Sequence, residues 1–149
     1  GHEIGVHTWS HPLLTKLSAT EIMNEIYQTS DAIASITGEY PKTLRPPYGA
    51  YNQLVKDSVM FPIINWSVDT LDWKTKNVRS IVETVKAKTQ NGSIILMHDI
   101  HKTSADAVDT VVRELSEQGY RFVTVSELLD ITNPSEHAGI VYTHKKSQI

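Results

Sequence analysis

The sequence of 149 residues contains no cysteine. Without cysteine, neither a disulfide framework nor a thiolate metal site is possible. The absence of cysteine also does not indicate whether the protein works in an oxidising or a reducing compartment. Any metal ion in this protein must therefore bind to histidine and carboxylate side chains.

Long apolar runs and clusters of basic residues are also missing. The most apolar run, Ile94 to Met97, is far shorter than the roughly 20 residues that cross a bilayer, so the sequence contains no membrane span. The net charge of −3 and the pI near 6.2 give no basic footprint, which excludes nucleic acid as an expected partner. The first residues, Gly1-His2-Glu3, show neither an initiator methionine nor a targeting signal, and we expect the chain to begin inside a domain.

The composition and the order of the patterns predict one domain of the α/β class. Apolar residues make up 40% of the chain, enough for a hydrophobic core. Apolar strands are predicted at 61–68, 93–98 and 120–125, and amphipathic helices separate them. The strand at 93–98 is apolar without alternation, which is typical of a parallel sheet covered on both faces.

One helix is predicted over residues 19–37. Ser18 and Glu21 form a capping box before it, and Gly38 supplies a stop after it. Its apolar face is expected to contain Ile22, Ile26, Ile33 and Ile36. At the other end of the chain, residues 132–149 are polar and are expected to form a solvated tail or a peripheral turn.

Two histidines lie four residues apart directly after the apolar segment 4–6. On a helical turn His7 and His11 would share one face and could reach a single Zn²⁺-like ion, although two ordinary histidines beside a loop are the other interpretation. Thr8 stands where a zinc metalloprotease has its glutamate base, so that pattern is not met.

Further polar side chains follow other strands, at the edge where α/β folds collect their functional groups. His98 ends a buried strand and Asp72 follows another, so the carboxylate could orient and charge the imidazole for general acid catalysis. Arg45 could clamp a carboxylate in its proline-rich turn. Tyr48 and Trp73 could form a sugar-binding wall or simply fill the core.

Together these places resemble the motifs of the NodB-type polysaccharide deacetylases, also called carbohydrate esterase family 4. The matching segments, in the family's order, are His7-Thr8-Trp9-Ser10-His11-Pro12, Arg45-Pro46-Pro47-Tyr48-Gly49, Asp69-Thr70-Leu71-Asp72-Trp73 and Leu96-Met97-His98. The resemblance covers about residues 1 to 130, and four motifs in order are far more specific than any single one.

The resemblance implies a distorted (β/α) barrel that lacks its first strands in this chain, with residues 1–131 as the larger, C-terminal part of one deacetylase domain. It implies a hydrolase that removes N-acetyl groups from N-acetylglucosamine in a cell-wall polysaccharide, outside the cell or at its surface. The motifs look most like those of Gram-positive peptidoglycan deacetylases. Chitin oligomers and acetylxylan are the alternative substrates.

The resemblance also assigns roles to the residues. His7 and His11 would be ligands of a divalent metal, with Zn²⁺ first and Co²⁺ or Ni²⁺ as alternatives. His98 would be the general acid and Asp72 would hold and charge it.

Four further residues take supporting roles in the resemblance. Arg45 would orient the catalytic base, and the backbone N–H of Tyr48 would bind the oxyanion. Trp73 and Leu96 would shape the acetyl pocket.

The family's first motif, a Thr-Phe-Asp-Asp type of segment that carries the base and a third metal ligand, does not occur in this sequence, which has no Asp-Asp pair. Three interpretations follow. An N-terminal fragment of the same domain supplies the motif as a partner, the chain is a piece of a longer protein, or the protein is a catalytically inactive carbohydrate-binding pseudoenzyme.

Overall fold

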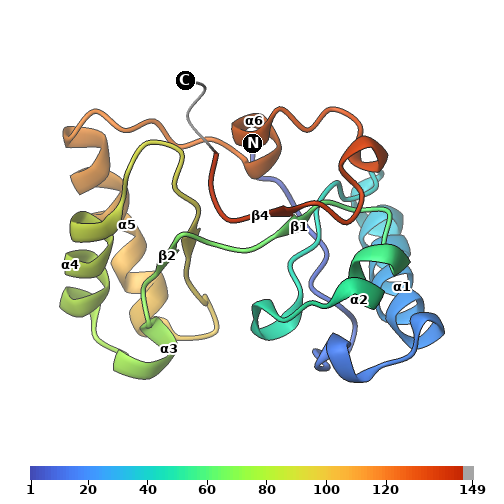
Figure 1. Ribbon diagram of the computed structural model, residues 1–149. Coiled ribbons are helices and arrows are strands. Elements are labelled where there is room, and N and C mark those ends of the chain that lie inside the picture. The colour runs from blue at the N-terminus through green and yellow to red at the C-terminus, as the bar shows by residue number, and fades with distance from the viewer. Residues whose placement is uncertain (146–149) are drawn as a thin grey trace. The chain divides into compact units, whose positions relative to one another are not determined.

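The computed structural model describes residues 1–145, and the chain divides into two compact units (Figure 1). Unit 1 comprises residues 1–65 and 124–142, and unit 2 comprises residues 66–123 and the C-terminal residues from Thr143 onward. Each unit has parallel strands and its own cluster of buried side chains. The α/β class predicted from the alternating patterns is therefore present in both.

Unit 1 is built on extended segments that pair in parallel. Its strands are β1 (Ile63–Ile64) and β4 (Val141–Tyr142), and its α-helices are α1 (Ala19–Thr37), α2 (Gln53–Ser58) and α6 (Val125–Leu129). Three 3-10 helices complete it: η1 (Leu14–Lys16), η2 (Pro47–Gly49) and η3 (Pro134–His137). Parallel bridges join Val6 to Leu44 and Leu44 to Ile63, and β1 pairs with β4, so four segments lie in the order Val6, Leu44, β1, β4.

Helix α1 has the bounds that the sequence predicts. Ser18 and Glu21 form the reciprocal capping box, and Gly38 ends the helix with φ of 81°, a left-handed conformation that glycine adopts without steric cost. Ile22 and Ile26 are fully buried, but Ile36 is 84% exposed, so its predicted place on the apolar face is wrong. The core contacts end before the last helical turn.

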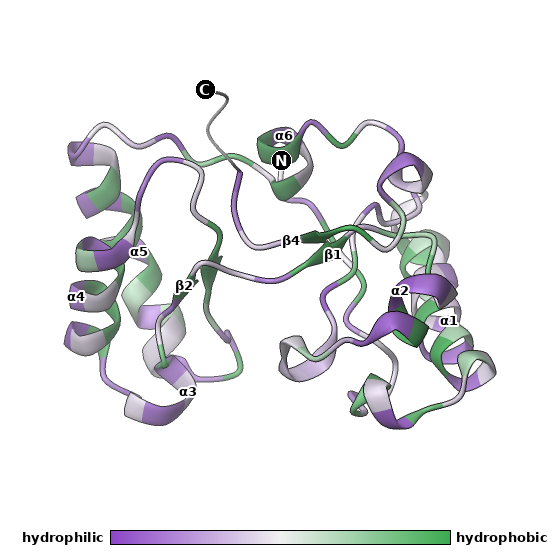
Figure 2. Cartoon of the chain, viewed as in Figure 1, coloured by the Kyte–Doolittle hydropathy of each residue, from purple (hydrophilic) through white to green (hydrophobic). Residues whose placement is uncertain are grey.

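Unit 2 pairs β2 (Val68–Asp69) with β3 (Ile95–Leu96) in parallel and contains α3 (Asp72–Thr75), α4 (Val78–Lys88) and α5 (Lys102–Glu117). Figure 2 shows both hydrophobic and hydrophilic stretches along α4 and α5, as amphipathic helices require. Their buried residues form one cluster, which contains Ile81, Val85, Ala107, Val111 and Leu115.

Two predicted strands differ in the structure. The strand expected at 61–68 is two short strands, β1 and β2, which belong to separate sheets. The strand expected at 120–125 does not form, and α6 begins at Val125, because the Thr124 side chain accepts a hydrogen bond from the Glu127 N–H as an N-cap.

Residues 132–149 were expected to form a solvated tail or a peripheral turn, and the described part contains both a short 3-10 helix and a strand. Residues 134–137 form η3, and β4 joins the sheet of unit 1 through bonds such as Ile63 N–H to the Ile140 carbonyl oxygen at 2.8 Å. This pairing is parallel and distant in sequence, so no local pattern announces it. The predicted tail residues 146–149 lie outside the described residues.

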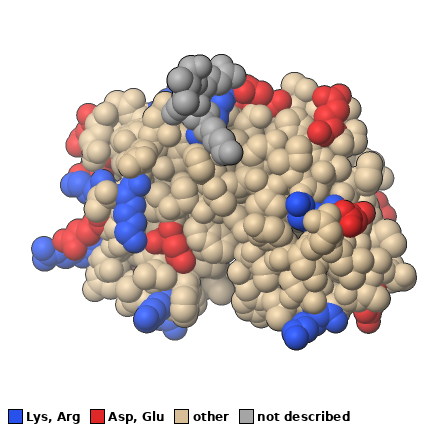
Figure 3. Space-filling view, viewed as in Figure 1, with Lys and Arg blue, Asp and Glu red and all other residues tan. Residues whose placement is uncertain are grey.

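The surface agrees with the charge analysis. On the face shown in Figure 3, acidic and basic groups are interspersed and no large patch of one sign is visible. None of the helices among residues 1–145 has the length and apolar composition that crossing a membrane demands.

The burial of α1 predicts a contrast between two isoleucines of the same helix. Ile26→Ala removes a fully buried side chain from the core of unit 1 and is expected to lower the free energy of unfolding by about 2–5 kcal/mol. The matched control Ile36→Ala alters an exposed side chain and is expected to stay within about 0.5 kcal/mol. Urea unfolding of both variants measures this, and equal losses would contradict the described packing.

Candidate active site

The loop with His7 and His11 brings its two imidazoles together without a helical turn. The ring centroids are 5.0 Å apart at an interplanar angle of 72°. Thr8 and His11 have φ of 71° and 59°, so the expected helical turn is wrong and a left-handed bend brings the rings close instead. Such backbone in a non-glycine residue costs about 1–3 kcal/mol and persists only where its surroundings hold it.

One hydrogen bond selects the tautomer of His7. Its Nδ1 lies 2.6 Å from the Arg45 carbonyl oxygen, which can only accept, so Nδ1 carries the proton. In the neutral ring the lone pair is then on Nε2, the nitrogen through which such a ring binds a metal ion. A metal-binding histidine is commonly oriented by donating its other N–H to a carbonyl in this way.

Glu25 of α1 holds the middle of the same loop. Its Oε2 accepts from the N–H groups of Trp9 and Ser10 at 2.9 and 2.8 Å, and its Oε1 accepts from the Ser10 hydroxyl at 2.6 Å. Burial would raise the pKa of Glu25, but the hydrogen bonds from Ser10 and Trp9 outweigh it and the pKa is lowered. Thr8 adds a bond inside the loop, accepting from the His11 N–H at 3.1 Å.

The segment Arg45 to Gly49 lies beside this loop. Arg45 donates from Nε to the Ile64 carbonyl oxygen at 3.1 Å and from Nη2 to that of Asn65 at 3.4 Å, and burial lowers its pKa. Tyr48 has φ of 60°, its side chain is 69% exposed, and its ring lies 5.0 Å from that of His11. Unit 1 therefore brings together four of the predicted residues, and Tyr48 does not fill the core.

The donors in this loop fit a soft or borderline divalent ion but do not complete a site. His7 and His11 supply two imidazoles at close range, the ligand type that suits Zn²⁺, Co²⁺ and Ni²⁺. In the described part of the chain, no group of three or more His, Asp or Glu residues could hold a metal ion. A catalytic zinc site normally has three protein ligands.

In unit 2, Asp72 and His98 form the pair that the sequence predicts. Asp72 is fully buried at the start of α3, and its Oδ1 lies 2.8 Å from Nδ1 of His98, whose side chain is 37% exposed. The His98 backbone N–H also donates to Oδ2 of the same carboxylate. The imidazole is thus held on one edge and open on the other.

The carboxylate of Asp72 accepts hydrogen bonds from two more donors. The N–H of Trp73 donates to Oδ1 at 2.9 Å, and the Ser104 hydroxyl of α5 donates to Oδ2 at 2.7 Å. Burial would raise the pKa of Asp72, but the bonds from Ser104, His98 and Trp73 outweigh it and lower the pKa. Asp72 is therefore an anion at neutral pH and places a negative charge next to Nδ1 of His98.

Two side-chain hydrogen bonds hold the loop directly before α3. Asp69 accepts from the Leu71 N–H at 2.9 Å, and the buried Thr70 hydroxyl donates to the Leu96 carbonyl oxygen at 2.8 Å. Trp73 is 50% exposed, so it does not fill the core, whereas Leu96 is buried in β3.

Sequence reasoning missed Glu25 and Ser104. Glu25 lies in a regular helical pattern and looks like a solvated glutamate, because its partners come from a loop 15 and 16 residues earlier. Ser104 gave one signal: it lies at helical spacing from Ala107, Val111 and Leu115, and a serine on such a buried face must find a hydrogen-bond partner.

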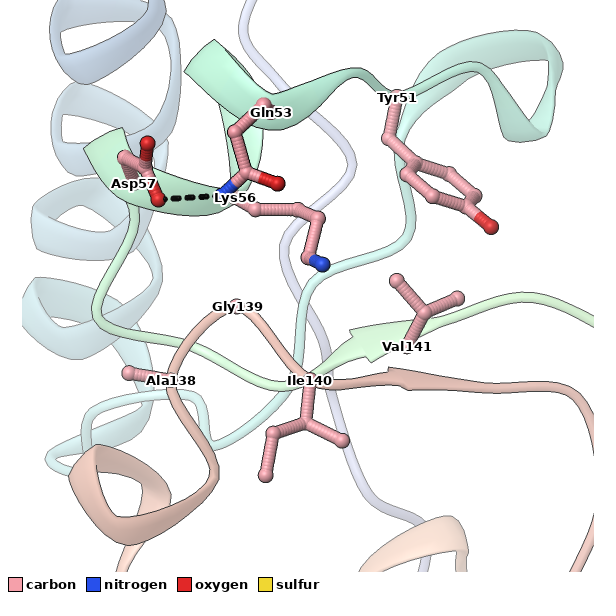
Figure 4. A pocket seen from close by; sticks show the side chains of 8 residues that line it. All are labelled: Tyr51, Gln53, Lys56, Asp57, Ala138, Gly139, Ile140 and Val141. Carbon is pink, nitrogen blue, oxygen red and sulfur yellow. Dashed lines mark hydrogen bonds between the residues drawn. The ribbon is translucent and has the colours of Figure 1, made fainter.

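A separate hollow of about 560 Å³ lies in unit 1 (Figure 4). Its lining includes Tyr51, Lys56 and Ile140, and the Gln53 side chain donates to Asp57 at 2.7 Å. None of the predicted site residues lines it. It is distinct from the His7 loop.

Comparison with known proteins identifies the family. A sequence profile of the family called Polysaccharide deacetylase matches residues 1–60. A solved structure of a deacetylase with substrate is 41% identical in sequence and superposes with a TM-score of 0.89. The alignment covers 95% of this chain and 70% of the chain in that structure. The chain belongs to the polysaccharide deacetylase family. The family's distorted (β/α) barrel, predicted from the motifs, is confirmed as the fold class.

Two curated relatives of this chain are named as peptidoglycan deacetylases. The peptidoglycan-N-acetylglucosamine deacetylase PgdA of Listeria monocytogenes is 50% identical over 128 residues, which are 86% of this chain and 28% of PgdA. The peptidoglycan-N-acetylmuramic acid deacetylase PdaC of Bacillus subtilis is 43% identical over 136 residues, 91% of this chain and 29% of PdaC. The chain thus spans less than a third of these relatives.

The bonds of Asp72 predict a pH-dependent effect of Ser104→Ala. At neutral pH the variant is expected to lose about 1–3 kcal/mol of unfolding free energy, because a hydrogen bond to a buried anion is removed. The folded pKa of Asp72 lies below its ordinary value of 3.8, so this contribution is complete above pH 3.8 and is lost as the pH falls through the folded pKa.

Denaturant unfolding at neutral and acidic pH measures the difference between the two proteins. The matched control Ser116→Ala alters an exposed serine of the same helix and is expected to change the free energy by no more than about 0.5 kcal/mol at either pH. A loss for Ser104→Ala that does not shrink in acid would show that the hydroxyl does not act through the carboxylate.

Proposed function

We propose that this protein is a metal-dependent hydrolase that removes N-acetyl groups from N-acetylglucosamine residues of peptidoglycan. One observation carries the proposal: a half-exposed imidazole, His98, is bonded to a buried carboxylate in a chain that is 50% identical to a peptidoglycan-N-acetylglucosamine deacetylase. Amide hydrolysis needs such a proton donor, because the amine is a poor leaving group until it gains a proton.

We assign His98 as the general acid. Its Nδ1–H is donated to Asp72, so the proton for the departing nitrogen comes from Nε2 on the open edge of the ring. Asp72 keeps the ring in this orientation and holds a negative charge beside it, because the lowered pKa of Asp72 leaves the carboxylate ionised. Asp72 is buried and acts through His98.

We assign His7 and His11 as ligands of a divalent ion, Zn²⁺ first, with Co²⁺ and Ni²⁺ as alternatives. The tautomer of His7 and the close approach of the two rings support this assignment. Such an ion supplies Lewis acidity, which lowers the pKa of water and polarises a carbonyl. The N-terminal part of the same domain, with its Asp-Asp motif, is proposed to supply a third ligand and the catalytic base.

The remaining predicted residues take positioning and binding roles. The backbone N–H of Tyr48, in a left-handed turn, is proposed to bind the oxyanion, and Arg45 to orient the base. Trp73, half-exposed after its strand, and Leu96 are proposed to contact the acetyl group and sugar.

The second candidate is N-acetylmuramic acid in the same polymer, because PdaC is named for that activity and is 43% identical to this chain. Either substrate places the protein outside the cytoplasm or at the cell surface, where peptidoglycan lies. We also propose that residues 1–131 are the larger part of a single deacetylase domain.

Acetate release from peptidoglycan by the full-length protein, with Zn²⁺ or Co²⁺ added, tests the function. His98→Ala is expected to lower kcat by about 10²- to 10⁴-fold, the usual contribution of general acid catalysis, and to leave metal affinity unchanged. The control His2→Ala alters an exposed histidine outside the site and is expected to keep full activity. Polymer binding without any acetate release would identify the wild-type protein as a pseudoenzyme.

A further inference from the structure

We infer that Glu25 is a positioning residue for the metal site: its carboxylate holds the Trp9–Ser10 backbone so that His7 and His11 face one ion. The inference rests on the proposed function, since it assumes that these two histidines bind the metal. It concerns residues of unit 1 alone.

The first argument is where the carboxylate bonds. Both backbone N–H groups that Glu25 binds lie between the two histidines, and the Ser10 hydroxyl adds a third bond to the same side chain. A side chain that only joined α1 to the loop would need one such bond. Three bonds to two adjacent residues fix both the position and the orientation of that segment.

The second argument is that the loop needs support. Thr8 and His11 both have positive φ, and Thr8 is β-branched, so the bend is unfavourable for the residues that form it. His7 is oriented by its hydrogen bond to the Arg45 carbonyl oxygen, and the His11 N–H donates to Thr8 within the loop itself. Glu25 is the residue that ties the segment directly before His11 to helix α1. Without Glu25, we expect the distance between the two imidazoles to vary more widely.

The third argument is that Glu25 stands on a rigid base. Ile22 and Ile26 flank it on α1 and are fully buried, and the capping box fixes the start of the helix. A ligand-bearing loop that is bonded to a well-packed element is held more precisely than a loop that supports itself.

Co²⁺ titration of the full-length protein, followed by its visible absorption, tests the inference without any assay of activity. Glu25→Ala is expected to weaken Co²⁺ binding by about 10- to 100-fold, as for loss of other groups that orient metal ligands. Glu25→Gln keeps an oxygen that accepts from the two N–H groups, so its affinity is expected to fall between those of Glu25→Ala and the wild type.

Glu21→Gln is the matched control. It weakens the capping box of the same helix but does not contact the His7 loop, so it is expected to lower thermal stability and keep the Co²⁺ affinity. Equal losses of affinity for Glu21→Gln and Glu25→Ala would show a general effect of α1 and overturn the inference. Equal losses for Glu25→Gln and Glu25→Ala would show that charge alone acts, which also overturns it.

The outcomes separate this inference from the proposed function. If the wild type and Glu25→Ala bind Co²⁺ with the same affinity, only the inference falls and the metal site stands. If the wild type binds no Co²⁺, the proposed metal site and the inference fall together.

Discussion

The burial of the Asp72 carboxylate is the constraint on which unit 2 depends. An ionised carboxylate that loses its water costs several kcal/mol unless donors replace the lost hydrogen bonds. Asp72 accepts four, from the Trp73 and His98 N–H groups, the His98 imidazole and the Ser104 hydroxyl. These donors come from α3, the end of the β3 segment and α5, so the charge is stable only when the three elements have their native positions.

In unit 1, acceptor oxygen atoms likewise bind donor groups, but most of these donors are backbone N–H groups of a loop. Glu25 is half-buried and binds two adjacent N–H groups, and the Arg45 carbonyl oxygen binds the ring of His7. These hydrogen bonds offset the conformational free energy of the left-handed backbone at Thr8 and His11, so this conformation persists in the folded protein. In both units an imidazole takes its orientation from an oxygen atom on a neighbouring segment.

Sequence reasoning succeeded where the determinants are local. Helix α1 begins and ends where Ser18 and Gly38 predict, because capping depends on residues a few positions apart. The pairing of Asp72 with His98 followed from the family resemblance and from strand ends. Strand β4 and the roles of Glu25 and Ser104 were missed, since each depends on a partner distant in sequence that no local pattern reveals.

The environment of Asp72 also explains why an amide is no substitute there. Every group that contacts the carboxylate is a donor, and the backbone N–H groups of Trp73 and His98 cannot reverse that role. An asparagine at this position would direct its NH₂ group at the Ser104 hydroxyl or at the His98 ring. The hydroxyl could rotate and accept, but the ring could accept only by moving its proton to Nε2. The proton that the open edge of the ring presents, and the one that Asp72 now accepts, would both be rearranged, so the four hydrogen bonds as they stand require a carboxylate and not only a side chain of its shape.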